Sequence, residues 1–326
     1  MKETLTKIKK AIKGAQTALL ASHVDPDGDS IGSMLATGMI LSQFGVEVDY
    51  YSKDGVPRIY RFLQESGKVK KKITANKRYD LLITLDSSDI KRVGGDLPET
   101  GLAKLVINID HHPDNTKFAD INFVEKSSST AELVYYLAKS LKAKIALAVA
   151  ECLYVAIITD TGNFRYENTS ANTLAIAEDL LKAGVSPPEI TTRIYDTKSV
   201  ASIRVQAAAL SSLEISPERN VAWATATKEM MEKNHAKAED LVGLVDQIRS
   251  IDGIEVAILF REEDGKVKVN FRSKSKINVS EIARVFGGGG HMRAAGVIFE
   301  NKAIEQAKDE VIKEVLKRIK ASKYLV

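Results

Sequence analysis

The sequence predicts an α/β protein, with an N-terminal, mainly parallel sheet followed by a smaller C-terminal α+β region. Short apolar runs alternate with segments of helical periodicity over residues 1 to about 185, which is typical of parallel strands joined by helices. Pro187 and Pro188 then interrupt the pattern, and the segments beyond them include an expected hairpin. At 326 residues, the chain has room for two ordinary domains.

The first half of the chain is interpreted from the spacing of its apolar residues. Leu5, Ile8 and Ile12 recur at helical intervals and predict an opening helix. Continuous apolar runs such as Leu81–Leu85 predict strands covered on both faces, so we expect helices on both sides of the sheet. The other expected elements are strands at 17–22, 46–51 and 105–109, and helices at 30–44, 130–141, 145–159 and 173–183.

The second half has a different pattern. Glu263-Asp264-Gly265 is a turn sequence between the runs 255–261 and 266–272, which together predict a hairpin. Other expected elements are strands at 221–227 and 295–299, helices at 205–213, 241–248, 279–286 and 303–321, and a loop at 287–290. We therefore expect one domain over residues 1–186, a connector of helical character over 187–203, and a second domain over 204–326.

The composition describes a globular protein, with 44% hydrophobic and 28% charged residues. A net charge of +4 permits a polyanionic substrate, but the basic residues are spread widely and are typical of a solvated surface. Cys152 is the single cysteine and lies in an apolar run, which favours a buried thiol and a reducing compartment. No signal-type segment or run of roughly 20 apolar residues is present, so we expect a cytoplasmic protein without a membrane span.

Acidic residues and histidines gather at the ends of the apolar segments. An open α/β sheet binds its ligands at the carboxyl ends of its strands, so these side chains are expected to lie close together. Four such sites are enough for a two-metal cluster. They begin at His23, Asp86, Asp110 and Asp160.

The first of these groups is the segment His23-Val24-Asp25-Pro26-Asp27-Gly28-Asp29. Pro26 and Gly28 favour a turn, which would let His23, Asp27 and Asp29 point into one crevice. The N-terminus of the following helix would face the same crevice and favour anions. The alternative interpretation is an Asx-rich turn whose carboxylates only cap that helix.

The remaining groups also have two interpretations each. Asp86 follows a buried strand, where its carboxylate could bridge two cations or simply cap a helix. Asp110 could accept a hydrogen bond from a ligating histidine, and His112 could then face a phosphate. A surface or structural pair of His111 and His112 is the alternative. If Asp160 ends a helix, its carboxylate is unfavourably placed and invites a cation.

A mixture of carboxylate oxygen and imidazole nitrogen suits Mn²⁺, with Mg²⁺, Fe²⁺ or Co²⁺ as alternatives. No cysteine competes as a ligand, so a structural zinc site is not expected. Two cations about 3.5–4 Å apart would clamp a phosphoryl group. The four groups therefore indicate phosphoryl-transfer chemistry.

A second candidate site lies in the C-terminal half. Four successive glycines allow close approach of the backbone to a ligand, and their amides can form an anion nest. At the end of the expected hairpin, a guanidinium fork and a hydroxyl are available for phosphate. The alternative is a flexible loop beside a solvated basic strand. The candidate substrate-binding residues are Arg272, Ser273, Gly288, Gly289, Gly290 and His291.

Taken in order, five motifs resemble the DHH phosphoesterase superfamily, in its branch with a C-terminal DHHA1 domain. Within that branch, the chain is similar to the nanoRNase and 3′-phosphoadenosine-5′-phosphate (pAp) phosphatase type. Ser128-Ser129-Thr130-Ala131-Glu132-Leu133 also looks familial. The motifs are His23-Val24-Asp25-Pro26-Asp27-Gly28-Asp29, Leu85-Asp86-Ser87-Ser88-Asp89, Asp110-His111-His112, Thr159-Asp160-Thr161-Gly162 and Gly287-Gly288-Gly289-Gly290-His291.

The resemblance implies a catalytic, metal-binding DHH domain at 1–186 and a substrate-binding DHHA1 domain at 204–326. One metal would be held by His23, Asp27 and Asp86, and a second by Asp29, Asp86, His111 and Asp160, so that Asp86 bridges them. His112 would contact the scissile phosphate, and Asp86 and Asp110 would be catalytic residues with it. The nucleotide would be held by Arg272, Ser273, His291 and the glycines.

The resemblance also implies a manganese-dependent phosphodiesterase and exonuclease. It would degrade short RNA and linear dinucleotides such as pApA to nucleotide monophosphates, and dephosphorylate adenosine 3′,5′-bisphosphate. Mg²⁺ or Co²⁺ could substitute for the two Mn²⁺, no membrane partner is expected, and a homodimer is compatible with the resemblance. Three alternatives stay open: a cyclic dinucleotide (c-di-AMP) phosphodiesterase, an inorganic pyrophosphatase, and a non-catalytic nucleotide-binding module.

Overall fold

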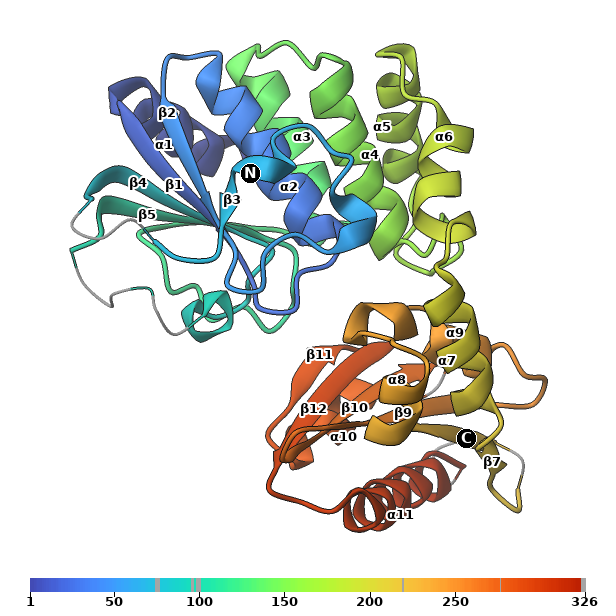
Figure 1. The fold of residues 1–326 in the computed structure, drawn as a ribbon. Coiled ribbons are helices and arrows are strands. Elements are labelled where there is room, and N and C mark those ends of the chain that lie inside the picture. The colour runs from blue at the N-terminus through green and yellow to red at the C-terminus, as the bar shows by residue number, and fades with distance from the viewer. Residues whose placement is uncertain (74–76, 95–96, 98–100, 219, 276, 324–326) are drawn as a thin grey trace. The chain divides into compact units, whose positions relative to one another are not determined.

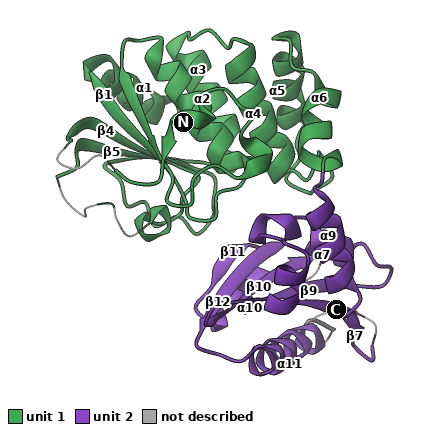
Figure 2. Ribbon diagram, viewed as in Figure 1, with its two compact units in different colours: residues 1–197 green, residues 198–326 purple. Residues whose placement is uncertain are grey.

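The computed structural model describes the whole chain except residues 74–76, 95–96, 98–100, 219, 276 and 324–326. It divides into two compact units, Met1–Thr197 and Lys198–Val326 (Figure 2). The division falls within 187–203, where we expect the connector. Each unit has its own six-stranded sheet and apolar core, so the two are described separately. Among the described helices, none combines the length and apolar character needed to cross a membrane.

Unit 1 contains a sheet with the strand order β3-β2-β1-β4-β5-β6, in which every paired neighbour is parallel (Figure 1). The chain adds strands outward from β1 in one direction and from β4 in the other. The carboxyl ends of β1 and β4 therefore flank a topological switch point, where such sheets leave a crevice. The strands are β1 Thr17–Ser22, β2 Glu47–Tyr51, β3 Val69–Lys70, β4 Tyr79–Leu85, β5 Ala103–Asp110 and β6 Ile121–Val124.

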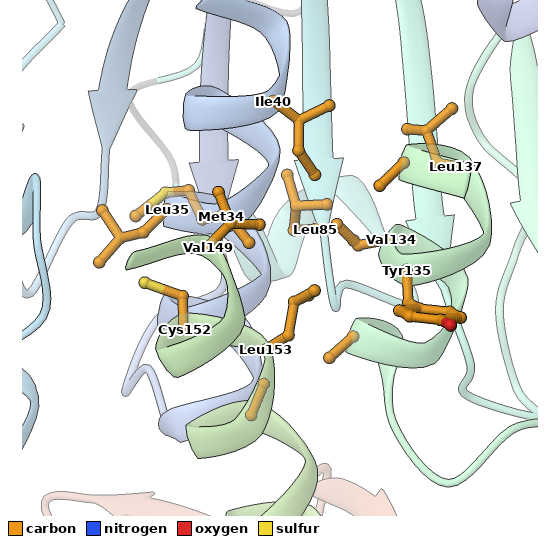
Figure 3. Close-up of a cluster of buried hydrophobic side chains, with 14 of the residues drawn as sticks. Met34, Leu35, Ile40, Leu85, Val134, Tyr135, Leu137, Val149, Cys152 and Leu153 are labelled. Atoms are coloured by element: carbon orange, nitrogen blue, oxygen red, sulfur yellow. The ribbon is translucent and has the colours of Figure 1, made fainter. Parts of the chain in front are cut away.

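The α-helices of unit 1 cover one face of this sheet. Apolar side chains at alternate strand positions, such as Leu20, Ile83 and Ile109, form one core with residues of the helices. Figure 3 shows side chains of α2, α3 and α4 meeting in this core around Leu85. The helices are α1 Lys2–Gly14, α2 Gly28–Ser42, α3 Thr130–Leu141, α4 Leu147–Asp160, α5 Ala171–Lys182 and α6 Pro187–Thr191, continued by the π-helix η4 Thr192–Asp196.

The opposite face of the sheet does not carry the α-helices that the apolar runs suggest. Leu19, Ala21 and Leu82 belong to a separate cluster with Val93, which lies in the segment between β4 and β5. Within the described part of the chain, this cluster receives residues from the 3-10 helix η3 Ile90–Val93 and from loops, but from no α-helix. An apolar run therefore predicts that a strand is buried on both faces, but it does not predict whether α-helices or loops cover those faces. The other 3-10 helices of unit 1 are η1 Arg58–Tyr60 and η2 Ser66–Lys68.

Two glycines allow α2 and α4 to pack closely. A Cβ atom at Gly32 would lie 2.4 Å from the carbonyl oxygen of Cys152, and one at Gly28 would lie 2.3 Å from Oγ1 of Thr159. A larger residue at either position would push the two helices apart. Cys152 is buried beside this contact, as its apolar surroundings predict (Figure 3). This close approach brings the first turn of α2 near the last turn of α4.

Most elements of unit 1 lie where the apolar spacing predicts them, including β1 and α3. Helix α2 begins two residues earlier than expected, because Asp27 is its N-cap and accepts a hydrogen bond from the amide of Ser30. The pattern misses β6, whose four residues are mostly half-buried and form no continuous apolar run. It also misses the two-residue strand β3, which is too short to have a period.

Unit 2 contains a mixed sheet with the strand order β11-β12-β10-β9-β8-β7. Strands β9 and β10 form the expected antiparallel hairpin, and β8 joins β9 in parallel. Helices α10 and α11 pack on one face and α7 and α9 on the other. The strands are β7 Glu214–Ile215, β8 Val221–Ala226, β9 Val256–Glu263, β10 Lys266–Ser273, β11 Gly289–His291 and β12 Ala294–Glu300. The helices are α7 Val200–Leu210, α8 Lys228–Lys233, η5 Ala238–Leu241, α9 Leu244–Arg249, α10 Val279–Val285 and α11 Ile304–Lys323.

The glycine-rich run is not the loop that the sequence suggests. Gly289 and Gly290 begin β11, which pairs with β12. A Cβ atom at Gly288 would lie 2.2 Å from the carbonyl oxygen of Gly296, and one at Gly290 would lie 2.5 Å from that of Ala294. Glycine is required at these two positions because any side chain would collide with the backbone of the neighbouring strand.

Candidate metal centre

The acidic and imidazole side chains of unit 1 gather at the carboxyl ends of the strands beside the switch point. They follow β1 and β4, end or follow β5, and occupy the N-cap and first turn of α2 and the last residue of α4. The structure thereby brings together every residue of unit 1 that the sequence nominates, namely His23, Asp27, Asp29, Asp86, Asp110, His111, His112 and Asp160.

The first cluster, called the His23 group below, consists of His23, Asp27 and Asp86. Nε2 of His23 lies 3.4 Å from Oδ2 of Asp86 and 3.8 Å from Oδ1 of Asp27. Nδ1 of the same ring faces the carbonyl oxygen of Val24 at 2.7 Å. A carbonyl can only accept, so a neutral ring carries its proton on Nδ1 and directs the lone pair of Nε2 toward the two carboxylates.

The second cluster, called the His111 group below, consists of Asp29, Asp86, His111 and Asp160. Nε2 of His111 lies 3.6 Å from Oδ1 of Asp86, 3.6 Å from Oδ2 of Asp160 and 3.8 Å from Oδ2 of Asp29. Nδ1 of this ring faces the carbonyl oxygen of Ser127 at 3.2 Å. The same argument therefore directs its Nε2 lone pair toward three carboxylates.

The separations in both groups fit ligands that share a cation. Two ligand atoms bound at about 2.1 Å, at an angle of roughly 90–120°, lie about 3.0–3.6 Å apart. The pairs at 3.4 and 3.6 Å fall within this range, and the two pairs at 3.8 Å lie just beyond it. All of these separations are longer than a hydrogen bond. Asp86 turns Oδ2 toward the His23 group and Oδ1 toward the His111 group, and its backbone has a φ of 57°. Because one carboxylate faces both groups, the donor set suits a pair of divalent cations bridged by Asp86.

His112 is oriented by a short chain of hydrogen bonds. Its Nδ1 lies 2.7 Å from Oδ1 of Asp110, whose Oδ2 accepts a hydrogen bond from Nδ2 of Asn115 at 2.6 Å. The sequence offers Asp110 as the partner of a ligating histidine, but the structure pairs it with His112, while His111 faces the backbone of Ser127. Asp110 therefore fixes the ring that we expect to face phosphate.

Burial and crowding of charge shift the pKa values in this cluster. Burial, reinforced by neighbouring carboxylates, raises the pKa of Asp29 well above its ordinary value. Burial likewise raises the pKa of Asp160 to about 7, although His111 opposes the shift. Burial alone would raise the pKa of Asp86, but three surrounding histidines outweigh it and hold the pKa far below its ordinary value. Burial lowers the pKa of His112, yet two carboxylates outweigh it and raise the pKa to about 9. So many opposing shifts indicate a functional site.

Sequence reasoning missed the neutral groups that hold the cluster. Oγ1 of Thr130 donates a hydrogen bond to Oδ1 of Asp86 at 3.0 Å, and Nδ2 of Asn168 donates to the carbonyl oxygen of Asp160 at 3.2 Å. The carbonyl oxygen of Arg92 accepts from the amide of Val24 at 2.7 Å, which ties η3 to the end of β1. Of these residues, only Thr130 could have been found from the sequence, because it lies in the segment 128–133 that resembles the DHH superfamily.

In unit 2, strand register places Arg272 and His291 in one row. Ala294 of β12 pairs with Arg272 of β10 on one side and with His291 of β11 on the other. Opposed residues project from the same face, so the two longer side chains flank a small alanine, with their strands about 10 Å apart. Nε of Arg272 also lies 3.5 Å from Oδ1 of Asp246 in α9.

Ser273 is not placed in this structure for the contact that the sequence suggests. We expect its hydroxyl to contact phosphate, but the side chain is fully buried and donates a hydrogen bond to the carbonyl oxygen of Ile277 at 2.7 Å. The hydroxyl therefore stabilises the turn after β10. Arg272 and His291 are the polar side chains of the row that includes Ala294.

A parallel α/β unit with a candidate two-cation site at its switch point defines a class of proteins suited to phosphoryl transfer. The chain belongs to the DHH family: the family model "DHH family, N-terminal domain" matches residues 17–157, and "DHHA1 domain" matches residues 221–321.

Named relatives resemble the chain over almost its whole length. It is 33% identical to the "Bifunctional oligoribonuclease and PAP phosphatase NrnA" of Thermus thermophilus, over 98% of this chain and 95% of the relative. The protein of the same name from Bacillus subtilis is 30% identical, over 89% and 92% of the two chains. Among solved structures, an exopolyphosphatase-related protein from Bacteroides fragilis is 26% identical and superimposes with a TM-score of 0.88, covering 100% of this chain and 98% of the other.

Proposed function

We propose that the protein is a manganese-dependent phosphodiesterase that degrades short RNA oligomers and linear dinucleotides such as pApA to nucleotide monophosphates. Adenosine 3′,5′-bisphosphate is proposed as a further substrate of the same site. The names of the relatives support this substrate class. The observation that carries the proposal is the position of Asp86, whose two oxygens face two separate groups of candidate ligands.

Two cations fit these residues. The His23 group would hold one and the His111 group the other, with Asp86 shared between them. Nitrogen and carboxylate donors in one site suit Mn²⁺, although Mg²⁺ and Co²⁺ accept the same donors. When bound, such a pair would neutralise phosphoryl oxygens and favour ionisation of an attacking water.

His112 would contact the scissile phosphate. Its hydrogen bond to Asp110 holds the ring in place, and its raised pKa of about 9 keeps it protonated at neutral pH in the metal-free protein. A protonated imidazole donates a charge-assisted hydrogen bond to a phosphoryl oxygen. Asp110 therefore contributes to the reaction through His112 and not by contact with the substrate.

In unit 2, the row that includes Arg272 and His291 would hold the nucleotide. A guanidinium presents a fork of donors that matches phosphate, and a histidine can donate from the other side of Ala294. The sequence also nominates Gly288, Gly289 and Gly290, and we propose that they let a ligand approach the backbone of β11 beside His291; the amide of Gly288 itself donates to the carbonyl oxygen of Ala283 at 2.8 Å. We therefore propose this row as the part of unit 2 that binds the nucleotide.

We also place the enzyme in a reducing, cytoplasmic compartment. Cys152 is the single cysteine of the sequence and is buried, so the chain cannot form an internal disulfide. Its fold therefore does not depend on an oxidising environment.

A product time course with purified protein and Mn²⁺ tests the function. Linear pApA, a five-nucleotide RNA, adenosine 3′,5′-bisphosphate, c-di-AMP and pyrophosphate are supplied separately at equal concentration. Faster turnover of the linear substrates is expected. Preferential cleavage of c-di-AMP would indicate a cyclic dinucleotide phosphodiesterase instead. Hydrolysis of pyrophosphate and of no other substrate would show that nucleotides are not substrates and would indicate an inorganic pyrophosphatase. Repeating the assay with EDTA, Mg²⁺ and Co²⁺ identifies the required cation.

A further inference from the structure

The segment Ser127–Ala131, which connects β6 to α3, touches the members of the His111 group. The carbonyl oxygen of Ser127 faces Nδ1 of His111 at 3.2 Å. The amide of Thr130 donates to Oδ2 of Asp29 at 2.7 Å, and the amide of Ala131 donates to Oδ1 of Asp29 at 3.1 Å. Both oxygens of Asp29 are thus oriented by the N-terminus of α3.

The same segment reaches the other two carboxylates of the group. Oγ1 of Thr130 donates to Oδ1 of Asp86 at 3.0 Å. Nδ2 of Asn168 lies 2.8 Å from the carbonyl oxygen of Ser128 and 3.4 Å from Oδ2 of Asp160, so it links the segment to the end of α4. Every member of the His111 group is therefore positioned directly by this segment or through one amide.

The His23 group is oriented by different atoms. Nδ1 of His23 faces the carbonyl oxygen of Val24 at 2.7 Å, and Oδ1 of Asp27 accepts from the amide of Ser30 at 3.0 Å. Both contacts are local to the connection between β1 and α2. Asp86 is shared, and Oδ1 of Asp29 also accepts from Oγ of Ser33 in α2 at 3.0 Å. The contacts from the segment Ser127–Ala131, in contrast, reach the His111 group and not His23 or Asp27.

Glu132 anchors the segment. Its side chain is buried, with 3% exposure, and Oε1 accepts from the hydroxyl of Ser128 at 2.5 Å and from Oγ1 of Thr173 at 2.6 Å. Oε2 accepts from Nδ2 of Asn172 at 3.0 Å. A buried carboxylate requires such donors, and the first turn of α3 also favours its charge. Glu132 therefore fastens Ser128 to the start of α5.

We propose that Glu132 is a positioning residue for the cation of the His111 group, and that it has little influence on the cation of the His23 group. The inference rests on the proposed function, because it concerns how the cluster binds the two cations. Without its anchor, the segment can shift, and Asp29 then loses the amides that orient both of its oxygens. Asp160 loses its link to the segment for the same reason, whereas His23 and Asp27 keep their local contacts.

The test is a Mn²⁺ titration of metal-free protein, followed by electron paramagnetic resonance and calorimetry. Wild type is expected to bind two Mn²⁺ with a spin-coupled signal. Glu132→Gln is expected to keep one tight site and to weaken the other by about 10- to 100-fold, the range found when groups behind metal ligands are changed. At low occupancy, the spectrum should then be that of an isolated Mn²⁺.

A paired substitution separates positioning from general loosening of the fold. Glu132→Gln places an amide donor against the amide of Asn172, so one hydrogen bond is lost. Adding Asn172→Asp restores an acceptor there, and it moves the negative charge only to the first turn of α5, where a helix favours it. The double variant should recover the second site. Ser128→Ala, which removes the hydroxyl through which Glu132 holds the segment, should weaken the same site to a similar extent.

Glu178→Gln is the matched control, because Glu178 is exposed on α5, the helix of Asn172, where it pairs with Lys182. This substitution should leave both sites unchanged. Equal weakening of both sites in Glu132→Gln, two unchanged sites, or failure of Asn172→Asp to restore binding would each overturn the inference. If wild type itself does not bind two Mn²⁺, the proposed function fails instead, so the two failures are distinguishable.

Discussion

Thr130 and Asp29 lie 101 residues apart in the sequence and are joined by a hydrogen bond of 2.7 Å, from the amide nitrogen of Thr130 to Oδ2 of Asp29. Ser129, the N-cap residue of α3, makes no capping hydrogen bond with its own side chain. Asp29, which lies in the first turn of α2, accepts the hydrogen bonds from the N-terminal amides of α3 instead. A side chain of one helix therefore caps another helix. The carboxylate is therefore already oriented before any cation binds.

Asp86→Asn is expected to abolish binding of both cations and to reduce turnover by about 1000-fold or more. Asn is the informative replacement because it tolerates the φ of 57° at this position, where most side chains are strained. Isothermal titration with Mn²⁺ and the product time course provide the measurements. Asp89→Asn is the control, since Asp89 caps η3 and an Asn side chain can do the same. Retention of one tight Mn²⁺ site in Asp86→Asn would argue against a bridging carboxylate.

Asp110→Asn is expected to lower the pKa of His112 from about 9 toward its ordinary value of 6.5, because the ring loses its carboxylate partner. An NMR titration of the His112 ring proton in metal-free protein measures this directly. A pKa of His112 that stays near 9 would show that Asp86, and not Asp110, controls the ring.

The metal-free protein is expected to lose stability as pH rises from about 5 to 9. Folding raises the pKa of Asp29, Asp160, His23 and His112, so the folded state binds more protons than the unfolded state over this range. The free energy of unfolding therefore falls with pH. Asp86 has the opposite sign, but its lowered pKa acts only below the ordinary value of 3.8.

Thermal unfolding in EDTA at pH 5.5, 7.0 and 8.5 measures this trend. Mn²⁺ should reverse it, since cations bind the deprotonated ligands and stabilise the folded state increasingly as pH rises. Asp160→Asn should flatten the metal-free trend near pH 7. A metal-free protein that becomes more stable toward pH 8.5 would contradict the proton balance of the cluster.

Gly32→Ala is expected to destabilise the protein by about 1–3 kcal/mol, because the new Cβ atom would lie 2.4 Å from the carbonyl oxygen of Cys152. Since α2 and α4 must separate to relieve this contact, the affinity for Mn²⁺ should fall as well. Urea unfolding and Mn²⁺ titration measure the two effects. Gly14→Ala is the control, as a Cβ atom there meets nothing within 4 Å. An unchanged Mn²⁺ affinity would show that the helix contact does not govern the cluster.

Arg272→Ala is expected to raise KM for pApA by about 10- to 100-fold, the effect of removing a hydrogen bond to a charged group, and to leave Mn²⁺ binding unchanged. Initial-rate kinetics separate KM from kcat. Lys266→Ala is the control, because it lies at the opposite end of β10 and pairs with Glu300. A fall in kcat at constant KM would move Arg272 from substrate binding to the chemical step.

His23, Asp86, Asp110 and Asp160 could be predicted as candidate site residues because each directly follows, or ends, a hydrophobic element, whereas Asp27 and Asp29 were nominated from the turn that Pro26 and Gly28 favour. A buried strand such as β4 is recognisable from its apolar run, and parallel strands deliver their carboxyl ends to one edge. His23, Asp86 and Asp110 are therefore brought together by topology alone. Which carboxylate pairs with which histidine is not predictable in this way. The structure shows that Asp110 is hydrogen-bonded to His112.

The groups that support the ligands could not be predicted, since they act through atoms that leave no pattern. Ser127 contributes a backbone carbonyl and Ala131 a backbone amide, which every residue possesses. Asn168 is one neutral side chain in a polar segment. In unit 2, the glycine run suggested a ligand loop, but Gly288 and Gly290 are explained by the neighbouring strand, which the sequence does not reveal.

The anchor at Asn172 and Thr173 has a consequence for the order of events during synthesis. A growing chain that has reached Asp160 already contains every side chain of both cation groups. Glu132 still lacks its two partners from α5 at that stage, so the segment before α3 has nothing to hold it. If Glu132 positions the His111 group as proposed, the centre would acquire its final geometry only after the ribosome has added α5. Binding of the second cation would then require the completed unit and not the nascent chain.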